Sequence, residues 1–241
     1  MRISIITALF NEEDSIPSLL SNYAELLKLS PPECQYEFLF INDGSRDNSL
    51  NLLISNLLKE WDYKVLTHSV NLGFGAALRT GIEAASGEII VCYDADSTYP
   101  VEDILKLVNK INDGWDIASA NPFHGRKVIE RVPLWRQGLT RLNAGLYKVA
   151  LGKAGGQVAI FSCAFRAYRR EVIQSISFTS NGFGAASEIL GRLILKKYNV
   201  IEIPSSLSTR QFGESKMNVR KAVGEHLRNV ILFLRIKYLK H

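Results

Sequence analysis

Two aspartates stand one residue apart in the stretch YDADSTYP (93–100), behind the apolar run EIIV and just before a proline. Neighbouring carboxylates repel each other, so the pair is unfavourable unless a positive charge lies between them. Mg²⁺ and Mn²⁺ prefer oxygen ligands, and Mg²⁺ is commonly held by one or two carboxylates together with phosphate oxygens. We therefore expect Asp94 and Asp96 to hold a divalent metal that in turn binds a diphosphate. A two-aspartate motif is common by chance, so its position in the fold decides its weight.

The elements before this pair predict that position. Strands are expected at 3–9, 36–43, 63–68 and 88–96, and helices are expected to begin at Asn11, Asn48, residue 74 and Pro100. Strands separated by single helices predict a doubly wound, mostly parallel α/β sheet, whose ligands bind beyond the carboxyl ends of the strands. Polar residues follow each of those ends: Asn11 and Glu12, then Asn42, Asp43 and Gly44, then Asn71 and Gly73, then Asp94 and Asp96.

The second half of the chain is less regular. The stretch 121–133 is irregular and basic, and it precedes an expected helix at 134–151, a glycine-rich turn, a strand at 159–168, a helix at 184–198 and a strand at 200–204. No linker composition or internal repeat separates the halves. We expect one domain with a nucleotide-binding front half and an irregular substrate-side back half.

Two features of the front half have competing interpretations. The glycines of NLGFGAALRTG (71–81) do not form the G-x-G-x-x-G fingerprint of dinucleotide sites. Close packing of a small-residue helix on the sheet is favoured over direct phosphate contact. Asp43, in NDGS, is either a turn-former or a ligand contact, and the ligand contact is favoured.

The composition sets limits on the class of protein. Hydrophobic residues make up 46% of the chain, enough for a sizeable core, and the formal charge of +5 suggests anionic partners. No segment approaches the roughly 20 apolar residues that cross a bilayer. Cys34, Cys92 and Cys163 are isolated, which favours buried thiols in a reducing compartment over a metal site. A cytoplasmic protein is expected.

The C-terminal stretch 217–241 is basic and amphipathic. Apolar residues recur at three- and four-residue steps from Val219 to Tyr238, and six lysines or arginines accompany one acid, Glu225. This pattern predicts an interfacial helix attracted to anionic lipid. The alternative is a helix packed on the enzyme body or at an oligomer contact.

The motifs TALFNEE, NDGSRDNS, NLGFGAALRTGI, YDADSTYP, FRAYRREV and RQFGESK, in this order, resemble family 2 glycosyltransferases of the GT-A fold. The chain looks most like the branch of dolichol-phosphate mannose synthase and related polyprenyl-phosphate glycosyltransferases, over residues 3–220. The resemblance implies a GT-A domain at 1–219, divided into a nucleotide-sugar-binding half (1–117) and an acceptor-side half (118–219), followed by the amphipathic helix at 220–241.

The resemblance also implies roles for single residues. The nucleotide-sugar site would comprise Ala8, Phe10, Glu12, Asp43, Asn71, Gly73, Asp94, Ser215 and Lys216. The catalytic group would comprise Asp94, Asp96, Glu188 and Arg210, with both aspartates near the metal, and the acceptor side would comprise Arg136, Ser162 and Arg166.

Three positions depart from the family pattern. Ala8 and Phe10 stand where proline and tyrosine are frequent, and Thr98 stands where a glutamine often adds a metal ligand. The segment SANPFHG (119–125) lacks an acceptor-side arginine, which His124 or Arg126 would have to replace.

The implied reaction is an inverting displacement that moves a hexose from a UDP- or GDP-sugar, with Mg²⁺ or Mn²⁺ and nearby cations stabilising the leaving diphosphate. A polyprenyl phosphate acceptor at the inner face of the membrane needs no general base, whereas a sugar hydroxyl does. Glu188 is the candidate base, and its alternative is a first-turn helical glutamate. The donor's base and sugar stay open, as does a homo-oligomer. The rival functions are a nucleotidyltransferase and a non-catalytic basic module binding membrane or nucleic acid.

Overall fold

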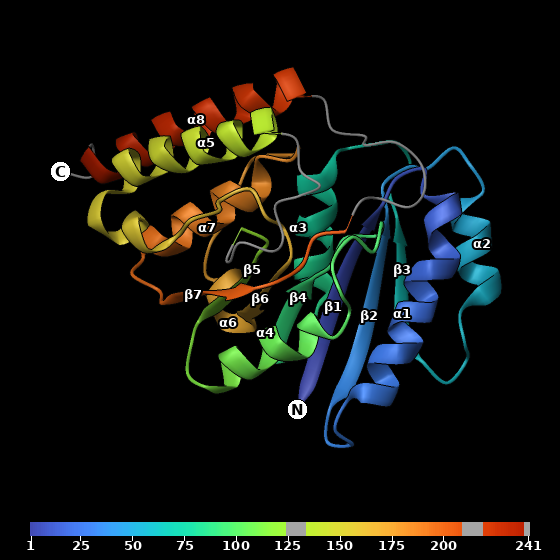
Figure 1. Cartoon of the computed structure of the whole chain (residues 1–241). Coiled ribbons are helices and arrows are strands. Elements are labelled where there is room, and N and C mark those ends of the chain that lie inside the picture. Colours follow the sequence, from blue (N-terminus) through green and yellow to red (C-terminus); the bar gives the residue numbers. More distant parts are fainter. Residues whose placement is uncertain (124–133, 209–218, 239–241) are drawn as a thin grey trace.

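A seven-stranded sheet forms the centre of the computed structural model, which describes residues 1–123, 134–208 and 219–238 (Figure 1). Its order is β3-β2-β1-β4-β6-β5-β7. The strands are β1 (Arg2–Leu9), β2 (Gln35–Asn42), β3 (Asp62–Thr67), β4 (Ile89–Cys92), β5 (Ile117–Asn121), β6 (Arg166–Arg169) and β7 (Val200–Pro204).

Most neighbouring strands of the sheet are parallel. β1 pairs in parallel with β2 and β4, β2 with β3, and β5 with β7, whereas β6 runs antiparallel to β4 and β5. Leu9 pairs with Asn42, and Asn42 pairs with Thr67, so these three strands end together. The predicted mostly parallel α/β sheet is confirmed, and its carboxyl edge gathers the polar residues that follow the strands.

Alternating apolar residues bury both faces of the sheet. On β1, Ile5 points into one apolar cluster and Ile6 into the other; on β2, Phe40 and Ile41 divide in the same way. The helices are α1 (Ile16–Leu29), α2 (Ser49–Asn56), α3 (Phe74–Ala84), α4 (Asp103–Asn112), α5 (Leu134–Leu151), α6 (Arg170–Gln174), α7 (Ala185–Leu195) and α8 (Val219–Tyr238), with 3₁₀ turns η1 (Glu13–Ser15) and η3 (Gly152–Gln157). Helices α1 and α4 cover one face; α3 and α7 cover the other.

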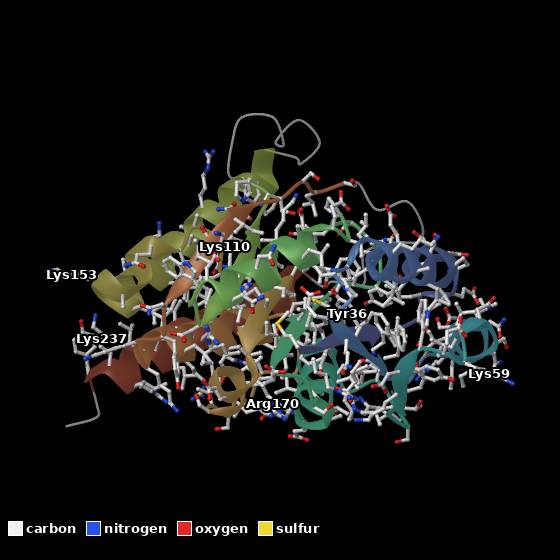
Figure 2. The ribbon with its side chains drawn as sticks, turned by 90° about the horizontal axis from the view of Figure 1, so that it is seen from below. Tyr36, Lys59, Lys110, Lys153, Arg170 and Lys237 are labelled. Carbon is white, nitrogen blue, oxygen red and sulfur yellow. The ribbon has the colours of Figure 1, made fainter. Side chains whose placement is uncertain are left out.

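Helices α5 and α8 lie side by side outside α7 (Figure 1). Phe233 of α8 is fully buried, and its ring lies so close to Gly191 of α7 that an added Cβ would be 2.2 Å from it. Lys153, just beyond α5, and Lys237 of α8 mark the same end of this layer (Figure 2). The C-terminal helix is thus packed on the rest of the fold through one face.

Several element boundaries differ from the predicted ones. Helix α1 begins at Ile16 rather than after Asn11, because Asn11 adopts a φ of 53° and its side chain accepts a bond from the amide of Arg46. Helix α4 begins at Asp103 rather than at Pro100. A turn comes first, in which the Asp103 amide donates to the Pro100 carbonyl oxygen. The fourth strand ends at Cys92.

The strand predicted at 159–168 is wrong for most of its length. Only Arg166–Arg169 pairs in the sheet. The amides of Ala159 and Ile160 donate to the Glu202 carboxylate, and the carbonyls of Ile160 and Phe161 accept from Arg166. Because side chains take up these backbone hydrogen bonds, residues 159–161 do not pair with a neighbouring strand.

Candidate active site

Hydrogen bonds lock together the loops that follow β1 and β2. The Asn11 amide donates to Ser45 Oγ at 3.1 Å, and the Glu12 amide donates to Ser49 Oγ at 2.7 Å. The expected nucleotide-pocket residues Ala8, Phe10 and Glu12 are all partly buried on this segment. The two loops therefore form one fixed wall at the carboxyl edge of the sheet.

Asp43 is buried and organises the loop that follows β3. Its Oδ1 contacts His68 Nδ1 at 2.7 Å and accepts from the Leu72 amide at 2.9 Å, while Oδ2 accepts from the Gly73 amide at 2.8 Å. The other ring nitrogen of His68 bonds Thr80 Oγ1 at 2.9 Å. Asp43 thus shapes the expected nucleotide pocket, and its own contact with a base stays a prediction. Sequence reasoning missed His68, since a lone histidine at a strand end has no distinguishing spacing.

The glycines of the first turn of α3 allow a close approach to the loop before α7. A Cβ on Gly75 would lie 2.2 Å from the Ser180 carbonyl oxygen, and one on Gly73, whose φ is 102°, would lie 2.3 Å from that of Asn181. Gly75 also donates its amide to Asn181 at 2.7 Å. The predicted packing on the sheet is seen at Gly81, where a Cβ would lie 2.5 Å from Ile6 Cγ2 of β1, whereas Gly73 and Gly75 approach the loop before α7. Contact of Gly73 with the nucleotide stays a prediction. Asn71 is exposed and remains a predicted nucleotide contact.

Asp94 and Asp96 lie beyond the end of β4, and both are partly exposed. The segment is fixed by Tyr93, whose hydroxyl donates to the Tyr99 carbonyl at 2.7 Å and whose ring packs edge-on against Phe165. Burial raises the pKa of Tyr93, so the hydroxyl stays a neutral donor. Ser97, directly after the pair, has a φ of 53°, so the chain turns away from the strand direction here.

Thr98 supports the second aspartate of the pair. Its amide and its hydroxyl both donate to Asp96 Oδ1, at 3.2 and 3.0 Å. Where the family pattern often has a metal-ligating glutamine, this chain thus has a residue that orients Asp96. An oriented carboxylate fits a metal-binding role.

The donor set tests whether a divalent cation fits here. Among residues 1–123, 134–208 and 219–238, no group of three or more His, Cys, Asp or Glu side chains forms a preassembled metal site. Two partly exposed carboxylates suit an ion that takes its other ligands from water and phosphate oxygens. The residues fit a metal that binds together with a diphosphate.

The chain returns to this edge after β7. Ser205 Oγ donates to the buried Asp103 carboxylate at 2.6 Å, and the Ser208 amide donates to the Thr98 carbonyl at 2.8 Å. Ser208 precedes Arg210 by two residues. Arg210, Ser215 and Lys216 themselves lie outside the described residues.

The acceptor-side residues are divided between buried and exposed positions. Ser162 is exposed. Arg166 is fully buried, and its guanidinium donates to Ser119 Oγ and to the carbonyls of Ile160, Phe161 and Ala186 at 2.7–3.2 Å. This geometry makes Arg166 a structural cation rather than the expected acceptor contact. The side chain of Arg136, and the residues His124 and Arg126, lie outside the described part of the structure.

Glu188, the candidate base, is also fully buried. Its carboxylate accepts from the amides of Thr179 and Ser180 and pairs with Arg192 Nε at 2.8 Å. Burial opposes ionisation, but the bonds from Ser180, Arg192 and Thr179 outweigh it and lower the pKa of Glu188. Such a group is a weak base, and its role as a base stays a prediction.

Comparison with known proteins agrees with this arrangement. Residues 4–177, more than half of the chain, match the model of the family described as glycosyl transferase family 2. The chain belongs to glycosyl transferase family 2. The resemblance seen in the sequence motifs is therefore confirmed at the level of the family.

Two curated relatives have names that contain a polyprenyl phosphate. The chain is 29% identical over 236 residues to the dolichol-phosphate mannosyltransferase of Pyrococcus furiosus, covering 98% of the chain and 64% of the relative. It is 30% identical over 225 residues to the undecaprenyl-phosphate 4-deoxy-4-formamido-L-arabinose transferase of Enterobacter sp. strain 638, covering 92% and 64%. The chain thus spans just under two thirds of the length of each relative.

Solved structures support the GT-A fold. The glucosyl-3-phosphoglycerate synthase of Mycobacterium tuberculosis, in complex with Mn²⁺, UDP and glucosyl-3-phosphoglycerate, has a TM-score of 0.67 and 21% identity. That similarity covers 98% of this chain and 79% of the synthase. The same enzyme with phosphoglyceric acid has a TM-score of 0.69 at 20% identity, covering 98% and 79%.

Proposed function

We propose that this protein is an inverting, metal-dependent glycosyltransferase that moves a hexose from a UDP- or GDP-sugar to a polyprenyl phosphate at the membrane surface. The observation that carries the proposal is the pair Asp94 and Asp96, held at the carboxyl end of β4 next to the returning segment 205–208. Family membership and the Mn²⁺ and UDP of the structural neighbour support the donor chemistry.

The site residues would bind three parts of the donor: the metal, the diphosphate and the nucleotide. Asp94 and Asp96 would hold Mg²⁺ or Mn²⁺, which when bound neutralises charge on the diphosphate. Arg210, Ser215 and Lys216 follow Ser208 along the chain, and we assign them to the same diphosphate. Ala8, Phe10, Glu12, Asn71 and Gly73 would form the nucleotide pocket, shaped by Asp43.

The buried state of Glu188 favours a phosphate acceptor over a sugar hydroxyl. A hydroxyl must lose a proton to a base within hydrogen-bond reach, and the Glu188 oxygens are engaged with Thr179, Ser180 and Arg192. A lipid phosphate has a second pKa of about 6 and attacks without a base. The names of the two curated relatives point the same way.

The outer face of the α5–α8 layer favours a peripheral position at the inner face of the membrane. No described helix is both long enough and apolar enough to span a bilayer. Exposed apolar side chains line this face instead: Leu142, Leu146 and Val149 on α5, and Val223, Leu227, Ile231 and Tyr238 on α8. An apolar face with neighbouring cations is typical of interfacial helices.

Calorimetric titration of UDP and of GDP, with and without Mn²⁺, tests the donor site directly. We expect metal-dependent binding of one nucleotide and loss of that dependence in Asp96→Asn. Metal-independent binding, or binding of neither diphosphate, would contradict the proposal. Release of pyrophosphate from a nucleoside triphosphate would instead favour the nucleotidyltransferase.

A further inference from the structure

A groove lies between α8 and the loop before α7, and none of the residues assigned to donor or acceptor lines it. The same loop also packs against Gly73 and Gly75 at the start of α3. Its volume is about 530 Å³. Its lining residues are Thr179, Ser180, Asn181, Gly182, Lys221, Glu225, Arg228, Asn229, Ile231, Leu232 and Arg235. The loop residues form one wall and a face of α8 forms the other.

The cations of the groove lie on one face of α8. Lys221, Arg228 and Arg235 are spaced by seven residues, so they lie on nearly the same face with their Cα atoms about 10 Å apart along the axis. All three are exposed, and within the described part of the chain neither Arg228 nor Arg235 forms an ion pair. Arg228 and Arg235 therefore give the groove an edge whose positive charge is not balanced by an ion pair in the described residues.

The single acid of the groove is already engaged with the protein. Glu225 is 9% exposed, and its Oε2 accepts from the Gly184 amide at 2.8 Å. A Cβ on Gly182 would lie 2.1 Å from Glu225 Oε1, so the loop lies directly against this carboxylate. Asn229, 2% exposed, donates to the Gly184 carbonyl and accepts from Ser180 Oγ. Glu225 and Asn229 thus form a polar, hydrogen-bonded floor. The residues that line the groove include three cations and one acid.

The groove is continuous with the exposed apolar face of α8. Ile231 lines the groove and is 52% exposed, and it lies one turn from Leu227, which is 49% exposed. A ligand with an anionic head and an apolar tail would contact both surfaces at once. A soluble phosphate would use only the cations.

We infer that this groove binds the phosphate group of an anionic membrane lipid, distinct from the acceptor, whose chains lie against Leu227 and Ile231. The inference rests on the proposed membrane position of the α5–α8 face. It adds a headgroup site that would fix the orientation of the enzyme on the bilayer. The recognition is charge-assisted hydrogen bonding by Arg228 and Arg235.

Vesicle binding by matched double variants tests the site. Arg228→Gln with Arg235→Gln removes two groove cations; Arg141→Gln with Lys153→Gln removes two exposed cations outside the groove. Two cations near an anionic surface contribute about thirtyfold in affinity when they act only through the surface potential. On phosphatidylcholine vesicles containing phosphatidic acid, we expect the groove pair to lose at least about tenfold more affinity than the control pair. Equal losses would overturn the site.

Two further measurements separate a lipid headgroup site from a general patch of charge and from a site for soluble phosphate. Arg228→Lys with Arg235→Lys should regain part of the binding, because charge returns without the bidentate fork. Soluble glycerol phosphate should bind weakly; binding as tight as that of the vesicles, lost in the groove pair, would overturn the lipid in favour of free phosphate. Mn²⁺-dependent nucleotide binding is measured in parallel, and its retention in the groove pair separates failure of this site from failure of the proposed function.

Discussion

The backbone amide of Ser208 donates to the carbonyl oxygen of Thr98 at 2.8 Å, and Thr98 in turn donates to Asp96. The last segment after β7 is thereby joined to the carboxylate pair after β4. This link connects residues more than 100 positions apart in the chain, and it holds Ser208 at the carboxyl edge of the sheet.

Replacing Asp96 with Asn should abolish metal-dependent turnover without unfolding the protein. The amide keeps the shape and the bonds from Thr98 but loses the charge that binds a cation, so kcat should fall at least about hundredfold. Transfer assays with varied Mn²⁺ measure this. Asp113→Asn is the control, because that exposed carboxylate pairs with Lys110 on α4, beyond the loop of the aspartate pair in the chain. Comparable activity of both variants would contradict the metal site.

His68→Ala should weaken nucleotide binding and lower stability together. The change leaves the buried Asp43 carboxylate without its His68 partner, which costs about 1–3 kcal/mol, and it loosens the 68–73 loop. Urea unfolding and nucleotide titration give the two values. Thr67→Ala, at an exposed neighbouring position, is the control. Unchanged nucleotide affinity in His68→Ala would mean that the loop does not contact the donor.

Glu188→Gln distinguishes a structural carboxylate from a base. We expect a lower melting temperature, because Arg192 loses its charged partner, while transfer to a polyprenyl phosphate is largely retained. Transfer to a sugar hydroxyl, tested in parallel, should be abolished if Glu188 is a base. Loss of phosphate transfer in a variant that remains folded would contradict the base-free mechanism.

Gly75→Ala should destabilise the protein, and Gly145→Ala should not. The new Cβ at residue 75 would lie 2.2 Å from the Ser180 carbonyl oxygen, a clash typically costing about 1–3 kcal/mol, whereas Gly145 on α5 has open space around it. At residue 145, alanine should raise the free energy of unfolding by up to about 1 kcal/mol, because alanine has the higher helix propensity. Chemical denaturation measures both, and equal effects would contradict the close approach of α3 to the 180–184 loop.

The low pKa of Glu37 should make the folded protein less stable in acid. Burial would raise its pKa, but bonds from Lys64, Ser4 and Ser86 lower it to about 2 from 4.5. Because the folded pKa is the lower one, this carboxylate contributes stability above about pH 4.5, and the contribution disappears as the pH falls toward 2. Unfolding free energies measured from pH 7 to 3 should fall less steeply in Glu37→Gln than in the wild type. Parallel curves would show that Glu37 is not responsible.

The sequence predicted the strands of the front half and the edge where they end, because alternating and continuous apolar runs are local signals. It did not predict that Arg166 and Glu188 are buried. Besides the side chains of Ser119 and Arg192, their partners are backbone groups at 160–161, 179–180 and 186. No side-chain pattern identifies those backbone partners. Likewise, Asn11 was expected to cap a helix, but a contact with the loop after β2 holds it in a left-handed conformation. Local preference gave way to tertiary bonding in all three cases.

The antiparallel strand β6 has a consequence for how the polypeptide can be divided. It lies between β4 and β5 and is hydrogen-bonded to both, although it follows β5 by 45 residues in the chain. A fragment ending at residue 117 would leave the backbone of β4 without its neighbour, open to pairing with other molecules. The segments before and after residue 117 therefore share one sheet, and we expect them to fold as one cooperative unit rather than as exchangeable modules.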